Sequence, residues 1–181
     1  MNNTFERDEA LRPMSRDHGV LLVIAQRLRK AAAGTENDRQ VLTGELRETF
    51  GALIEEYLSD EEDALTSIAM DEDVRKEMLL EHAIIRVALK RLINCINADF
   101  SQYHFSGLSD SIEDHVRWDE EAMFPYIQRE LSSEERKTLA GATAVLELRH
   151  CRPTQRLRSS VELHKAAGKA ETCTCANCAG L

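Results

Sequence analysis

The stretch Ser109–Tyr126, SDSIEDHVRWDEEAMFPY, carries the strongest signal for the fold. Drawn as a helix, it has one stripe of residues spaced three or four apart: Ile112, His115, Asp119 and Met123. This stripe puts an imidazole and a carboxylate among apolar side chains, where both are costly to bury unless they are paired or bind a cation. The stretch therefore predicts either a surface helix with one stray histidine or one wall of a metal site.

Three other segments repeat this pattern. Each has apolar residues at helical three-four spacing, interrupted by side chains that can bind a metal. These side chains are His18 in 18–32, Tyr57 and Glu61 in 46–68, and His82 in 74–96. A single such histidine is more often a satisfied core residue than a ligand. Four stripes that are each interrupted in this way favour a shared metal site inside a helical bundle.

The composition fits one all-helical domain with extensions. The chain has 181 residues, with only 3 prolines, 8 glycines and 5% aromatic residues. Its formal charge of -9 argues against broad binding to nucleic acid or to an anionic membrane, which requires a basic face. Met1–Ala10 lacks the apolar core of a signal peptide, and no run approaches the roughly 18 apolar residues of a membrane span. We therefore expect a cytoplasmic protein that binds neither nucleic acid nor membrane.

The expected architecture is all-α, an up-down-up-down four-helix bundle over residues 14–131. Capping residues place the first two helix starts near Ser15 and near Thr35 or Asn37. The negative charges of Asp71 and Asp73 mark the start of the third helix, and the fourth is expected to start near Ser109. The first three helices are expected to end near Ala33, Ile68 and Phe100. Residues 101–109, SQYHFSGLS, are a predicted turn, and the missing N–H of Pro125 should kink or open the fourth helix.

Three segments are expected to flank this bundle. Residues 1–13 form a flexible N-terminal arm, and residues 132–150 form an accessory helix that begins with the capping box of Ser132 and Glu135. Residues 151–181 form a basic, cysteine-containing tail, either mobile or a weak sixth helix.

Imidazole and carboxylate ligands inside a bundle suit a metal such as iron or manganese. Carboxylates can also bridge two ions, as they do in the di-iron sites of other helical bundles. Tyr57 and Glu61 lie about as far before the turn near Ala69 as His82 lies after it, so these three side chains should meet at one level. Whether His115 lies at the same position along the bundle axis as these three side chains stays undecided. It depends on whether the third helix overhangs or the turn near His104 folds back.

At this point the chain resembles a known family. The segments SRDHGVLLVIAQRL, EEYLSDEEDAL, EHAIIRVALKRL and EDHVRWDEEAMFPYI, in this order, are similar to the hemerythrin-like (HHE cation-binding) domains of bacteria. The resemblance covers roughly residues 13–131 and implies a non-haem di-iron site that binds oxygen or nitric oxide, senses them, or handles iron. The family pattern is a histidine on the first and third helices and His-x3-Glu on the second and fourth. The residues that match it directly are His18, Glu61, His82 and His115.

Two positions depart from the family pattern. Tyr57 replaces the histidine of the second helix, and Asp119, one methylene shorter than glutamate, replaces the carboxylate of the fourth. Three consequences of the tyrosine are open. It binds ferric iron as a phenolate, it hydrogen-bonds a molecule bound at the site, or it fills core volume in a site that holds one ion or none.

The tail carries a second group of candidate ligands. Cys173, Cys175 and Cys178 lie close enough in sequence to hold zinc or to form a redox disulfide, although a structural zinc site requires four ligands. His164, Cys151 or another subunit could supply the fourth. The alternative is a reactive terminus without a bound ion.

The first functional hypothesis is a non-haem iron protein, di-iron or mononuclear, that binds or senses O2 or NO or responds to iron and redox state. The rival is a metal-free bundle that acts as an interaction module through its tail, with a second copy or another protein as partner. A di-iron redox enzyme is a weaker alternative. The sequence has no Gly-rich phosphate loop and no Ser-His-Asp ordering, so hydrolase and nucleotide-dependent chemistry have no support.

Overall fold

The computed structural model describes residues 7–94 and 102–150, and all regular structure in these ranges is helical. The elements, in chain order, are α1 (Arg12–Ala33), α2 (Glu36–Glu45), the π-helical turn η1 (Leu46–Phe50), α3 (Gly51–Thr66), α4 (Glu72–Asn94), α5 (Gln102–Trp118), the π-helical turn η2 (Asp119–Met123), α6 (Phe124–Glu130) and α7 (Ser133–His150). The chain divides into two units after residue 144, within α7, and the helical bundle belongs to the first.

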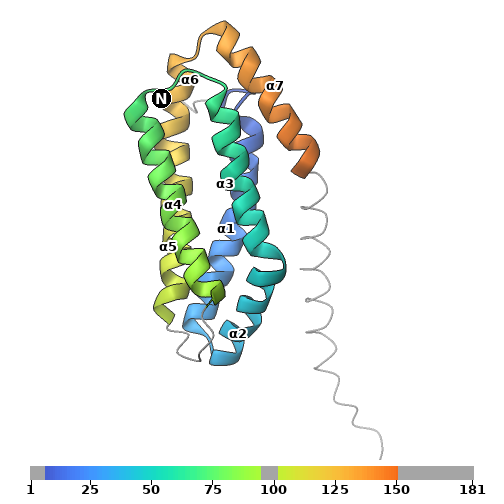
Figure 1. Ribbon diagram of the computed structural model, residues 1–181, viewed down its shortest axis with the longest axis vertical. Helices are drawn as coiled ribbons and strands as arrows, with labels where there is room; N and C mark the ends of the chain where they lie inside the picture. The colour runs from blue at the N-terminus through green and yellow to red at the C-terminus, as the bar shows by residue number, and fades with distance from the viewer. Residues whose placement is uncertain (1–6, 95–101, 151–181) are drawn as a thin grey trace, which may run out of the picture. The chain divides into compact units, whose positions relative to one another are not determined.

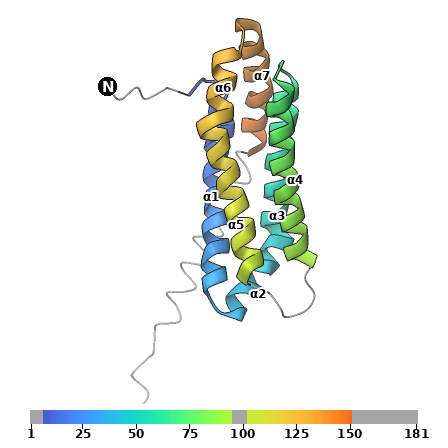
Figure 2. The same ribbon diagram turned by 90° about the vertical axis from the view of Figure 1, so that its left-hand side faces the viewer.

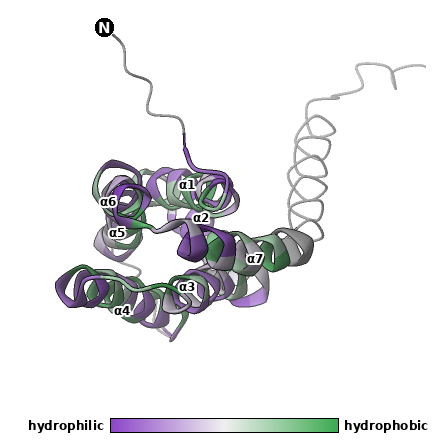
Figure 3. Cartoon of the chain, turned by 90° about the horizontal axis from the view of Figure 1, so that it is seen from above, coloured by the Kyte–Doolittle hydropathy of each residue, from purple (hydrophilic) through white to green (hydrophobic). Residues whose placement is uncertain are grey.

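The expected up-down-up-down bundle is confirmed in the first unit (Figures 1 and 2). Its four long members are α1, the α2–η1–α3 segment, α4, and the α5–η2–α6 segment. Seen from above, α3 and α4 lie side by side, and α1 and α5 lie together on the other side (Figure 3). α1 also contacts α3, and α4 contacts α5, so the four members form a closed ring. The apolar stripes predicted from the sequence face the inside of this ring.

α1 begins earlier than its predicted cap. Pro13 lies in the first turn, where its missing N–H breaks no helical hydrogen bond. Leu11 occupies the N-cap position and is fully buried. Ser15, the predicted cap, instead uses its hydroxyl to donate to Glu120 Oε1 at 2.5 Å. Packing of Leu11 therefore sets the helix start, and the serine is used at the candidate site.

The second long helix has the cap but not the uniform geometry that the sequence predicts. The capping box of Thr35 and Asp38 begins α2. The chain then widens into η1, where the N–H of Gly51 donates to the carbonyl of Leu46, five residues back. A Cβ added at Gly51 would lie 2.6 Å from this same carbonyl oxygen, so glycine is needed to close the wide turn. The sequence predicts that Gly51 weakens a regular helix, whereas the structure uses it in a π-helical turn.

The predicted turn over 101–109 is wrong over residues 102–109, which are the first two turns of α5. Phe105, Leu108 and Ile112 continue the three-four spacing of this helix and are fully buried. Burial of these side chains outweighs the turn preference of Gly107 and its serine neighbours. The earlier start lengthens α5, and His115 therefore reaches the level of His82 on α4.

Pro125 opens the fourth long helix, as predicted, through a second π-helical turn. In η2 the N–H of Phe124 donates to the carbonyl of Asp119. Pro125 follows in the first turn of α6, where it has no N–H to donate to a carbonyl four residues back. The predicted capping box that begins α7 is also confirmed, with Ser132 and Glu135 each bonding the backbone N–H of the other.

No helix in the described ranges is both long enough and apolar enough to cross a membrane.

We expect Gly51→Ala to lower the free energy of unfolding by roughly 1–3 kcal/mol, because the added methyl group meets the backbone of Leu46. Thermal and denaturant unfolding measure the change. Gly44→Ala is the matched control, since nothing lies within 4 Å of its Cβ position and alanine favours the helix by up to about 1 kcal/mol. Equal stability of the two variants would contradict the role assigned to Gly51.

Candidate metal centre

The bundle brings together six side chains that the sequence predicts to share a site. They are His18 on α1, Tyr57 and Glu61 on α3, His82 on α4, His115 on α5 and Asp119 at the start of η2. All six are buried, with relative exposures of 5% or less. Six polar side chains, three of them imidazoles, thus lie in the core of one helical ring. Their role as ligands stays a prediction.

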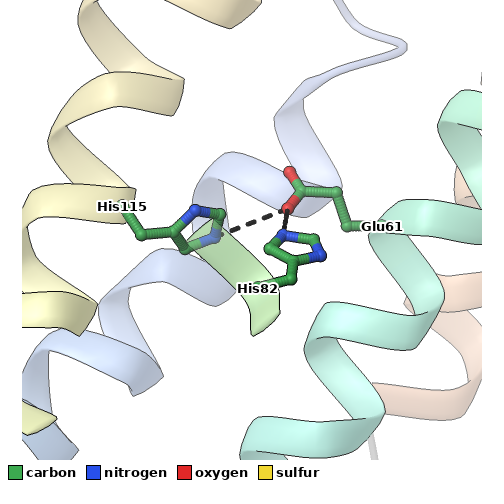
Figure 4. Close-up of side chains that lie close together, drawn as sticks. All are labelled: Glu61, His82 and His115. Atoms are coloured by element: carbon green, nitrogen blue, oxygen red, sulfur yellow. Dashed lines mark hydrogen bonds and ion pairs between the residues drawn. The ribbon is translucent and has the colours of Figure 1, made fainter. Parts of the chain in front are cut away.

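The first group consists of Glu61, His82 and His115, which converge from three different helices (Figure 4). Glu61 Oε2 lies 3.1 Å from His82 Nε2 and 3.5 Å from His115 Nε2. One potential ligand atom from each residue lies within 4.8 Å of the others. Two imidazoles and one carboxylate in this arrangement can bind a metal on one face and leave its other coordination positions open.

The second group consists of His18, Glu61 and Asp119, which meet the same distance criterion. Asp119 Oδ2 lies 3.1 Å from His18 Nε2 and 3.2 Å from His115 Nε2. Glu61 belongs to both groups. The two groups that could hold an ion are therefore adjacent and share one carboxylate, and Asp119 lies between His18 and His115.

Each histidine also contacts a carboxylate through Nδ1, on the side of the ring that faces away from Glu61 and Asp119. His18 Nδ1 lies 2.7 Å from Glu120 Oε1, and His82 Nδ1 lies 2.7 Å from Glu62 Oε1. His115 Nδ1 lies 3.1 Å from Glu81 Oε2. A carboxylate can only accept, so each Nδ1 carries the proton and donates it outward. Carboxylate partners of this kind set the tautomer and orientation of metal-binding histidines.

When Nδ1 carries the only proton of each ring, the three Nε2 lone pairs face inward, toward the oxygens of Glu61 and Asp119. Lone pairs that face carboxylate oxygens at such distances repel unless a proton or a metal ion lies between them. Among the described residues, His115 Nε2 and Asp119 Oδ1 are buried without any hydrogen-bond partner. The cluster therefore fits a cation, which would satisfy both atoms.

The outer carboxylates are held in turn by neighbouring side chains. Arg86 Nη1 donates to Glu62 Oε1 at 2.6 Å. Arg7 Nη2 donates to Glu120 Oε2 at 2.5 Å, and the Ser15 hydroxyl donates to its other oxygen. Each of these two chains of hydrogen bonds leads from an imidazole to a charged residue near the surface, which limits the freedom of the ring.

Tyr57 points toward two residues of the second group, His18 and Glu61. Its Oη lies 2.5 Å from His18 Nε2 and 3.4 Å from Glu61 Oε1. With the His18 proton on Nδ1, the phenol donates to Nε2. Burial raises the pKa of Tyr57 well above its ordinary value, and the charges of Glu61 and Asp119 add to this effect. Without a cation beside it, Tyr57 is a neutral phenol and a hydrogen-bond donor.

The two inner carboxylates have opposite pKa shifts in the absence of a metal. Burial raises the pKa of Glu61, but the hydrogen bond from His82 and the charges of the surrounding histidines outweigh burial and lower it. For Asp119, burial and the charge of Glu61 prevail over the attraction of His115, and its pKa is raised well above the ordinary value. Of the two carboxylic acids, Glu61 therefore has the lower pKa.

Sequence analysis missed the outer carboxylates. Glu62 and Glu120 each directly follow a predicted site residue in the acidic runs 60–63 and 119–121, of which the sequence predicts only Glu61 and Asp119 as ligands. Glu62, Glu81 and Glu120 are each adjacent in sequence to a site residue. Adjacency to an inward-facing ligand was the available signal. It did not specify which nitrogen each carboxylate meets.

Other candidates lie elsewhere or outside the described residues. His104, which the sequence places near a turn, is exposed on α5. Cys173, Cys175 and Cys178 lie outside the described residues, as do Cys95 and Cys151, so the tail site stays a prediction.

A helical bundle with buried, converging imidazoles and carboxylates defines a class of metal-binding domain. Comparison with protein families matches residues 9–127 to the hemerythrin HHE cation-binding domain. The chain belongs to this family, which confirms the resemblance. No curated protein and no solved structure matches the chain.

His82→Ala should remove most of the stabilisation by a metal, because His82 belongs to the group with two imidazoles. A bound ion present at about 1,000 times its dissociation constant adds roughly 4 kcal/mol to the free energy of unfolding, or about 8–16 °C in Tm. We expect Mn(II) to raise the Tm of the wild type and to raise that of His82→Ala much less. The exposed His104→Ala is the matched control and should respond as the wild type does. An equal Mn(II) response in all three proteins would contradict the site.

Glu120→Gln should produce a pH-dependent loss of stability in the metal-free protein. Burial alone raises the pKa of Glu120, but hydrogen bonds from His18 and Ser15 and the charge of Arg7 lower it from 4.5 to about 2. A lowered carboxyl pKa contributes stability above the unfolded value, and this contribution is lost as pH falls toward the folded value. We expect a difference from wild type of about 1–2 kcal/mol at pH 7 that shrinks between pH 4.5 and pH 2.

Denaturant unfolding at a series of pH values measures this difference. The neighbouring, exposed Glu121→Gln serves as the control and should differ little from wild type. A difference for Glu120→Gln that is independent of pH would contradict the role of its charge.

Proposed function

We propose that this protein is a non-haem iron protein that holds two iron ions in the bundle core and responds to O2, NO or redox state through them. The observation that carries the proposal is the pair of three-residue ligand groups that share Glu61. A single shared carboxylate between two sets of donors is the arrangement that carboxylate-rich dinuclear sites require. When bound, iron supplies redox-active centres with open coordination positions for a small diatomic ligand.

The donor set supports iron more than a soft metal. The groups combine imidazole nitrogens with carboxylate oxygens, and no thiol joins them within the described residues. The inward-facing Nε2 atoms also weigh against the metal-free interaction module. Such a module would have no reason to keep three imidazoles and two carboxylates in its core, where the lone pairs need compensation.

The two ion positions are unequal. His82, His115 and Glu61 supply two imidazoles and a carboxylate to the first position. At the second, His18 is the single imidazole, because Tyr57 occupies the place of the other. We infer that the first position binds its ion more tightly. At the second position, Tyr57 donates a hydrogen bond to His18 Nε2 while no ion is bound, or acts as a phenolate ligand when a ferric ion lowers its pKa.

The iron content of protein purified without chelator tests the ion count. We expect about two iron ions per chain in the wild type, with the second weakly held. His18→Ala should retain about one, and His82→Ala should lose the tightly held ion. A chain that takes up no Fe(II) under anaerobic conditions would overturn the proposal and favour the metal-free module.

Visible spectra distinguish the two roles of Tyr57. A phenolate bound to Fe(III) gives a broad absorption band that Tyr57→Phe removes, whereas a phenol that only donates a hydrogen bond gives none. Anaerobic addition of NO to the Fe(II) protein should produce new visible bands in the wild type and not in His82→Ala. Identical spectra before and after NO would contradict the proposed ligand.

A further inference from the structure

α4 exposes an unusual number of large apolar side chains. Eight such residues are exposed in the described ranges, and four of them, Leu79, Leu80, Ile84 and Val87, lie on this one helix. The remaining four are spread over other elements as single residues: Val23, Val41, Tyr103 and Val145. Scattered apolar residues are normal on a protein surface, whereas a gathered group indicates contact with a partner.

The exposed residues of α4 form a regular second stripe. The inner stripe packs into the core through Met78, His82, Ile85, Leu89 and Leu92. On the outer side, Leu80, Ile84 and Val87 are 55%, 49% and 48% exposed and are spaced four and three residues apart. A helix that is apolar on two sides is normally covered on both. In the bundle, α4 contacts α3 and α5, which leaves this outer side to solvent (Figure 3).

Charges of opposite sign lie at the two ends of the outer stripe. Glu77 precedes Leu80 by three residues, and Arg91 follows Val87 by four, so both continue the stripe's three-four spacing. Both are exposed, and neither forms an ion pair with a residue in 7–94 or 102–150. The stripe Glu77, Leu80, Ile84, Val87 and Arg91 has the seven-residue repeat with which helices pair.

We propose that this outer stripe of α4 binds the same stripe of a second copy of the chain, with the two helices antiparallel. A twofold axis at Ile84 brings this residue against its own copy and places each Leu80 against Val87 of the other chain. The same axis places each Glu77 beside Arg91 of the other chain. The proposal goes beyond the iron function and does not depend on it.

The positions of the charges favour an antiparallel pair of helices, and they favour a second copy of the chain as the partner that binds the stripe. In a parallel pair, Glu77 would meet Glu77 and Arg91 would meet Arg91, and both contacts would be repulsive. The antiparallel pair turns the same four charges into two attractive contacts. A stripe that complements itself in this way suits the isologous interface of a twofold dimer. Of the flanking lysines, Lys76 is already paired with Glu72 and Asp73 of its own helix, which reduces its repulsion of the other copy's Lys90.

Analytical ultracentrifugation of the full-length protein in a thiol reductant tests the dimer. We expect a concentration-dependent dimer in the wild type, and Ile84→Glu should weaken it by roughly 100-fold or more, because two like charges meet on the axis. Val41→Glu is the matched control, because Val41 is equally exposed but lies on α2, and it should leave the dimer intact. Circular dichroism confirms that both variants are folded.

A charge exchange tests the register. Glu77→Arg and Arg91→Glu should each weaken the dimer, and the double exchange should restore it, because each exchanged charge again meets its opposite in the antiparallel pair. A wild-type monomer at all concentrations, a dimer that survives Ile84→Glu, or a dimer that depends on disulfides and is lost in reductant would each overturn the proposal. Failure of the double exchange to restore the dimer would overturn the antiparallel register.

Discussion

The fold depends on one electrostatic constraint, the burial of three imidazoles and two carboxylates at the centre of the helical ring. Each imidazole turns its acceptor nitrogen inward because a carboxylate behind it holds the proton on the other nitrogen. The inner atoms are therefore mostly acceptors, and His115 Nε2 and Asp119 Oδ1 have no partner among the described residues. A core of this kind is stable only when positive charge, as protons or metal ions, lies within it.

One of the two π-helical turns, η2, positions side chains of this cluster. η2 begins at Asp119, so the chain widens where one inner carboxylate enters the core and the next residue, Glu120, reaches the back of His18. π-helical turns inside α-helices are frequent at functional sites. η1 has no such link. Its wide turn needs Gly51, and it connects the capped α2 to the helix that carries Tyr57 and Glu61.

Periodicity and capping could be predicted from the sequence because they depend on neighbours three or four residues apart. The inward stripes and the capping boxes at Thr35 and Ser132 are of this kind. The start of α5 was mispredicted because local turn propensity at Gly107 competes with burial of Phe105 and Leu108, which depends on the other helices. The contacts of Glu62, Glu81 and Glu120 with the histidines are mostly long-range, so spacing alone could not show which nitrogen each would meet.

The near-complete burial of the candidate ligands also has a kinetic consequence. An ion can reach Glu61, His82 or His115, each 1% exposed or less, only when the helices part. The rates of uptake and loss then follow local opening of the bundle, which differs in free energy from one element to another, and not the affinity of the closed site. A centre of this type would exchange its metal slowly. It would keep a bound ion for some time after the free ion has been removed from solution.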